Sequence, residues 1–147
     1  MPSGLPPGRR TANRPRPWLF AYALLLVSAT FVLIGLGGTV TSRDAALAVP
    51  DWPTSYGYNM FLFPPSLWVE GIFWEHLHRL SGTVVGMLTI GMMLWLWLIE
   101  DSRRWLRWFG VALLVLVIVQ GVMGGLRVTE LSITLAIVHG ITGQVFF

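Results

Sequence analysis

Residues 72–99, IFWEHLHRLSGTVVGMLTIGMMLWLWLI, decide the fold of this chain. The run is mostly apolar and longer than the ~20 residues that a helix needs to cross a bilayer. Its first turns nevertheless carry four ionisable side chains close together, which are Glu75, His76, His78 and Arg79. Ionisable groups inside lipid are costly and mark a functional site by default. The stretch therefore predicts a membrane helix with a chemical site near its first end.

The composition of the chain is that of a membrane protein. Of its 147 residues, 54% are hydrophobic and 12% are charged, whereas soluble domains carry about 25% charged residues. All ten basic residues are arginines, and there is no cysteine. The lack of cysteine excludes disulfides, thiolate metal sites and iron–sulfur clusters. Histidine and carboxylate remain as metal ligands. The net charge of +3 reflects few acids, and we expect no nucleic-acid partner.

Four apolar segments predict an all-α membrane protein, a four-transmembrane-helix bundle whose partner is membrane lipid. The expected membrane domain covers 18–147, with spans at about 18–38, 72–99, 109–125 and 132–147 and a loop at 39–71. The last segment is shorter than a span requires, so we expect the chain to be truncated within its fourth helix.

The start of the chain leaves one alternative open. Residues 1–17, rich in proline, glycine and arginine, predict a disordered tail. A cleaved signal peptide with a small-residue site at Ala46 and Ala48 is the alternative to a first span. The apolar run exceeds the 7–15 residues of such peptides, which favours a retained span.

Arginine placement predicts the orientation of the bundle. The tail and the charged turn 100–108 carry most of the arginines, and the other two connections carry one each. By the positive-inside rule, the N-terminus and this turn are cytoplasmic and the loop 39–71 lies outside. We therefore expect a multi-pass protein of the cell inner (plasma) membrane.

One face of the second span gathers the chemistry. At ~100° per residue, Glu75, His78 and Arg79 share a sector, and Gly82 continues it. His76 points away and is expected to contact the interface or the loop. Glu75 is the candidate catalytic group, because an acid at that depth must be paired, neutral or reactive. A structural alternative is that Arg79 only pairs with Glu75 at i, i+4.

His139 in the fourth span completes the candidate site. His78 and His139 both lie ~9–11 Å into helices that start on the same side. Equal depth on two helices is what bis-histidine ligation of one haem iron requires, so both are candidate metal ligands. Arg79 is suited to pair with a haem propionate. Each histidine alone could be a satisfied core residue. The glycines Gly121, Gly124 and Gly125 are expected to serve helix packing.

Four motifs resemble the haem A synthase family. The first span ends in GGTVTS, the loop holds PDWPTSYG at 50–57, span two opens with EHLHR at 75–79, and span three ends in QGVMGGLRV before His139. Their order and spacing cover nearly the whole chain from residue 30 onward. The family converts haem O to haem A for cytochrome oxidases.

The resemblance implies an eight-helix, pseudo-twofold protein of which this chain is the first half. Glu75 would be the catalytic carboxylate, with His78 and His139 as the histidine pair at the haem O site. A second half would hold haem b, so we expect the isolated fragment to be inactive. The implied partners are haem O, haem O synthase, cytochrome oxidase assembly factors and a second copy in a homo-oligomer.

Two other classes of protein remain open from the residues. A non-catalytic membrane cytochrome b would need His78 and His139 but not Glu75. A structural or assembly protein would bind no cofactor. The PDWP segment of the loop favours the enzyme over both.

Overall fold

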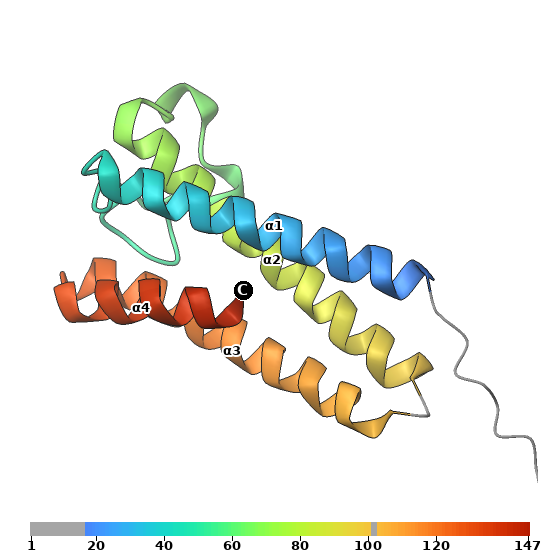
Figure 1. The fold of residues 1–147 in the computed structure, drawn as a ribbon. Coiled ribbons are helices and arrows are strands. Elements are labelled where there is room, and N and C mark those ends of the chain that lie inside the picture. Colours follow the sequence, from blue (N-terminus) through green and yellow to red (C-terminus); the bar gives the residue numbers. More distant parts are fainter. Residues whose placement is uncertain (1–16, 101–102) are drawn as a thin grey trace, which may run out of the picture.

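Helices account for most of the chain. The computed structural model describes residues 17–100 and 103–147. Within these ranges it has four α-helices, drawn in Figure 1: α1 (Pro17–Ser42), α2 (Glu70–Ile99), α3 (Arg104–Thr129) and α4 (Ile133–Phe146). The helices α1, α2 and α3 are each long and apolar enough to cross a membrane, and α4 is a shorter apolar helix. The expected all-α membrane fold is confirmed.

The helices extend beyond the predicted spans at several ends. Helix α1 includes Thr39–Ser42, which we expected in the loop; the Thr39 and Thr41 hydroxyls donate to the carbonyls of Gly35 and Gly37 at 2.9 and 3.2 Å. Such back-bonding lets a helix absorb polar residues at its end. Helix α3 begins at Arg104 and ends at Thr129, so most of the expected turn 100–108 is helical.

The predicted tail lies almost wholly outside the described part of the chain. The disorder that we expected for residues 1–17 concerns residues 1–16, which the structure does not describe. Pro17 is the first residue of α1. Proline is well placed there, because the first turn of a helix has no partner for its N–H group.

Successive helices pack against one another, α1 on α2, α2 on α3 and α3 on α4. A small apolar core of Leu26, Val85, Met92 and Leu96 joins the first two helices. The Tyr22 hydroxyl adds a hydrogen bond of 3.0 Å to the Leu88 carbonyl. Many large apolar side chains face outward from the helices, as they must where lipid surrounds a bundle.

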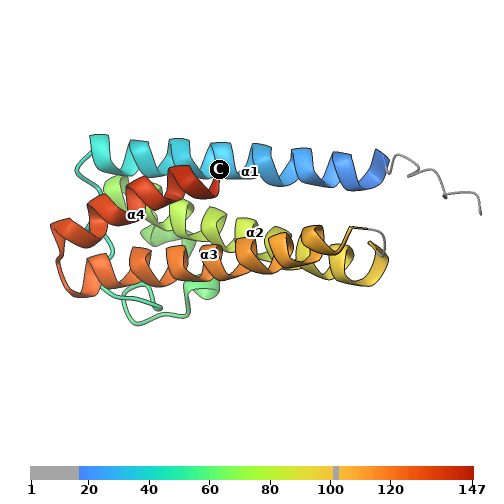
Figure 2. The same ribbon diagram turned by 60° about the horizontal axis from the view of Figure 1, so that its bottom comes forward.

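The connection between α1 and α2 folds over one end of the bundle, as Figure 2 shows. It includes two 3-10 turns, η1 (Met60–Leu62) and η2 (Pro65–Leu67). The loop turns at Asp51–Gly57, where the Asp51 carboxylate accepts from the backbone N–H groups of Tyr56 and Gly57 at 2.7 and 2.8 Å. At the other end of α4, the rings of Phe147 and Phe31 lie 6.0 Å apart.

Candidate functional site

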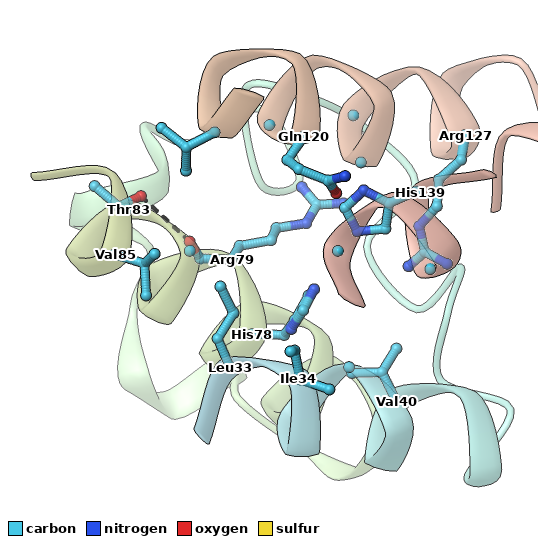
Figure 3. Close-up of a pocket in the computed structure, with 18 of the residues that line it drawn as sticks. Leu33, Ile34, Val40, His78, Arg79, Thr83, Val85, Gln120, Arg127 and His139 are labelled. Atoms are coloured by element: carbon cyan, nitrogen blue, oxygen red, sulfur yellow. Dashed lines mark hydrogen bonds between the residues drawn. The ribbon is translucent and has the colours of Figure 1, made fainter. Parts of the chain in front are cut away.

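All four helices enclose a cavity of about 470 Å³ at the loop end of the bundle. This volume is typical of ligand pockets. The cavity walls are mainly apolar, with His78, Arg79, Gln120, Arg127 and His139 among the polar exceptions (Figure 3). Trp52 and Pro53 of the loop line the same cavity.

The two candidate iron ligands face each other across this cavity. The ring centroids of His78 and His139 are 6.5 Å apart, and their planes are perpendicular at 90°. The residues come from α2 and α4, sixty-one positions apart in sequence. The structure thus brings together the pair that equal helix depth predicted.

A glycine of the preceding helix lies behind each imidazole. A Cβ at Gly37 would lie 3.1 Å from Cε1 of His78, and a Cβ at Gly124 would lie 3.1 Å from Cε1 of His139. A backbone carbonyl one helical turn before each glycine lies beside the same ring. The Leu33 carbonyl lies beside His78, and the Gln120 carbonyl lies beside His139. Each ring is therefore seated against a helix backbone in the same way.

The geometry of the pair fits a shared haem iron. Two metal–imidazole bonds of about 2 Å, plus the ring radii, require centroids about 6.3 Å apart. The Nδ1 atoms of both rings are buried and complete no hydrogen bond of full geometry, although a carbonyl lies beside each. A metal-bound imidazole uses one nitrogen for the metal and directs the other toward such an acceptor.

The described residues offer no protein-only metal site. No group of three or more histidine and acidic side chains gathers within residues 17–100 and 103–147. Two imidazoles alone leave most coordination positions of an iron open. Iron at His78 and His139 therefore stays an expectation that depends on a macrocycle supplying the remaining ligands.

Glu75 is held by an ion pair and by the loop. Its side chain lines the cavity, although the residue is only 1% exposed. One carboxylate oxygen accepts from Arg79 at 2.9 Å, and the other accepts from the Val49 backbone N–H at 2.9 Å. The i, i+4 pairing that the sequence left open is therefore present. It does not exclude a chemical role, because each oxygen keeps a further acceptor position.

Arg79 fastens the loop to α2. Its Nη1 donates to the carbonyls of Asp51 and Thr54 at 2.6 and 3.1 Å, and its Nη2 donates to the Val49 carbonyl at 2.8 Å and to Glu75. All four hydrogens of the two terminal nitrogens are thus used within the protein. A propionate on Arg79, which we predicted, would have to displace one of these partners.

His76 belongs to the loop rather than to the cavity. Its ring is fully buried, 5.0 Å from the Phe63 ring and 4.6 Å from the Trp68 ring between centroids. Its Nδ1 lies 3.3 Å from the Ser55 hydroxyl. The expectation that His76 contacts the loop is confirmed.

The glycines of α3 do more than pack helices together. Gly121, Gly124 and Gly125 line the cavity, and Gly124 seats His139. A Cβ at Gly125 would overlap the Trp52 ring, so this glycine makes room for the loop. Our interpretation of these residues as a helix-packing surface was therefore incomplete.

Sequence reasoning missed Arg127 and Gln120. Both are polar residues of α3 that line the cavity, and Gln120 hydrogen-bonds the Thr142 hydroxyl of α4. The available signal was a guanidinium directly after Gly124-Gly125, inside an otherwise apolar stretch. The expected spans at 109–125 and 132–147 place Arg127 in a connection between helices, where an arginine is ordinary.

Replacing Gly37 with alanine is expected to weaken binding of haemin about tenfold, because overpacking costs about 1–3 kcal/mol. The added methyl group would press on the His78 ring. The matched control is Gly38→Ala, since a Cβ there meets nothing within 4 Å. Haemin titration in detergent measures both. Equal affinities of the two variants would contradict the seating of His78 on Gly37.

The loop is expected to loosen in acid. Partial burial alone would raise the pKa of Asp51, but hydrogen bonds from Gly57, Thr54 and Tyr56 outweigh it and hold the pKa below its usual 3.8. This contribution to stability is complete above pH ~4 and is lost as the pH falls through the lowered pKa. Tryptophan fluorescence against pH should show this loss, and Asp51→Asn should remove it. An unchanged acid transition in Asp51→Asn would refute the assignment.

Fold and site together define a multi-pass helical membrane protein with a paired-histidine cavity. Residues 68–139 match the family described as cytochrome oxidase assembly protein. The heme A synthase of Sphingopyxis alaskensis is 28% identical over an alignment of 147 residues. The alignment covers 78% of this chain and 39% of that protein. The heme A synthase of Methylorubrum populi is 25% identical over 145 residues, covering 82% and 34%. No solved structure matches the chain.

Over residues 68–139, just under half of its length, the chain resembles this family, and both relatives are heme A synthases. The family match begins just before α2 and ends at His139, so it contains both cavity histidines and Glu75. The chain spans little more than a third of the length of these two relatives.

Proposed function

We propose that this chain forms the haem O site of a haem A synthase, at which a methyl group of haem O is oxidised to a formyl group. The observation that carries the proposal is the pair of imidazoles, 6.5 Å apart between centroids within one cavity. The similarity to two relatives that are both named heme A synthase supports the reaction.

In this proposal the histidines hold and orient the substrate. His78 and His139 would hold the haem iron, and the glycines behind them leave room for the two rings. When bound, the haem supplies the redox chemistry that protein side chains lack. The protein contributes position and electrostatics.

Glu75 is proposed as the group that moves protons or stabilises positive charge near the reacting methyl. A buried carboxylate is suited to either role. Arg79 and the Val49 N–H fix its orientation. Arg79 is thus a positioning residue, which also holds the loop whose Trp52 lines the cavity.

The wider arrangement is proposed from the family resemblance. The chain would be the first four-helix half of an eight-helix protein, with haem b bound in the other half. The short coverage of both relatives supports this arrangement. The proposed location is the inner membrane with a cytoplasmic N-terminus, in contact with haem O synthase, assembly factors and a second copy.

The test is haem analysis of the protein expressed from its native gene in a host that makes haem O but lacks its own haem A synthase. We expect haem A in membrane extracts, identified by mass. Bound haem with no haem A would instead indicate a membrane cytochrome b. A purified protein without a Soret band would indicate a protein without cofactor, and either result would refute the proposal.

A further inference from the structure

The charged groups of the cavity do not balance. Within the described residues, its ionic side chains are Glu75, Arg79 and Arg127. Glu75 and Arg79 form a salt bridge of 2.9 Å and neutralise each other. Arg127 remains as one positive charge in a mainly apolar wall, where an unpaired charge is costly.

Arg127 has little to bind among residues 17–100 and 103–147. Within these residues its single hydrogen bond goes from Nη2 to the Ala46 carbonyl at 3.5 Å, beyond the usual range of 2.7–3.2 Å. Arg79, by contrast, makes four bonds through its terminal nitrogens. In Figure 3 the Arg127 side chain extends from α3 toward the same space as His139.

From this imbalance we propose that Arg127, and not Arg79, binds a carboxylate of the ligand in the cavity. The inference rests on the proposed haem O site and names the contact that fixes the in-plane rotation of the macrocycle. The two imidazoles would hold the iron, but they would not stop a flat macrocycle from turning in its own plane. A guanidinium binds a carboxylate through two parallel hydrogen bonds and prevents that rotation.

The test compares two probes, haemin and haemin dimethyl ester, which lacks both free carboxylates. The full chain and its Arg127→Gln and Arg127→Lys variants are titrated with each probe in detergent. We expect Arg127→Gln to bind haemin about tenfold more weakly, since a hydrogen bond to a charged group is worth about 1.5–3 kcal/mol. The affinity of Arg127→Gln for the ester should change less than about twofold. The haemin affinity of Arg127→Lys should lie between those of the wild-type chain and Arg127→Gln.

Two control variants separate binding from folding. Arg43→Gln removes an arginine that lies over the Trp74 ring at 4.8 Å, away from the cavity, and should leave both affinities unchanged. Arg79→Gln should loosen the loop and lower the affinities for haemin and its dimethyl ester by the same factor. If Arg127→Gln lowers the affinity for both probes equally, or for neither probe, the inference is overturned.

The outcomes also separate this inference from the proposed function. If the wild-type chain binds haemin with a bis-imidazole spectrum but Arg127→Gln has no effect, only the carboxylate contact is wrong. If the wild-type chain binds neither probe through its histidines, the haem site itself fails, and the role of Arg127 fails with it.

Discussion

Replacing His78 or His139 with alanine should abolish the low-spin, six-coordinate haem spectrum and weaken haemin binding about 100-fold or more. Loss of a group that merely orients a metal ligand already costs 10–100-fold in affinity, and loss of the ligand itself costs at least as much. Both rings line the cavity, with centroids 6.5 Å apart. Optical titration of each variant with haemin measures the effect.

The third histidine provides the control for this experiment. His76 is fully buried but contacts Ser55, Phe63 and Trp68 of the loop rather than the cavity. His76→Gln is therefore expected to lower the unfolding temperature while the low-spin spectrum persists. A low-spin spectrum that survives in both His78→Ala and His139→Ala would show that other groups bind the iron.

In the protein expressed from its native gene, replacing Glu75 with glutamine should reduce haem A formation about 10²–10⁴-fold, the usual contribution of a positioned acid or base. Glutamine keeps nearly the same shape, and its carbonyl oxygen can still accept from the Val49 N–H group or from Arg79. Haem content should stay near the wild-type level. Mass analysis of extracted haems reports product and bound haem in one sample.

Glu75→Ala tests how much the Glu75 side chain contributes to stability. It leaves the Arg79 guanidinium without its buried partner, and breaking a buried pair in this way costs about 3–5 kcal/mol of stability. We therefore expect Glu75→Ala to unfold at lower temperature than Glu75→Gln, with both inactive. The control is Glu70→Gln at the exposed start of α2. Full haem A formation by Glu75→Gln would remove Glu75 from the chemistry.

The parts of the site that lie on helices could be predicted from sequence. Helical periodicity placed Glu75, His78 and Arg79 on one face, and equal depth paired His78 with His139. Both arguments need only the rise and twist of an α-helix, which are the same in every protein. This regularity is why two residues far apart in sequence could be placed opposite each other before the fold was known.

The contacts of the loop could not be predicted in the same way. The Arg79 bonds to Asp51 and Thr54 are made to backbone carbonyls, which every residue carries, so no side-chain pattern marks them. The fit of Trp52 against Gly125 depends on how the loop folds over α3. The helix ends were misplaced for a related reason, because polar residues such as Thr39 can satisfy themselves within a helix.

Electron paramagnetic resonance of the haemin-loaded chain would test most directly whether His78 and His139 bind one iron. Perpendicular ring planes, as the structure has at 90°, predict a low-spin ferric signal of the strongly anisotropic type seen when two axial imidazoles are not coplanar. The signal should disappear in His78→Ala and in His139→Ala alike. A high-spin signal in the wild-type chain, or a low-spin signal unaffected by either substitution, would contradict a shared iron.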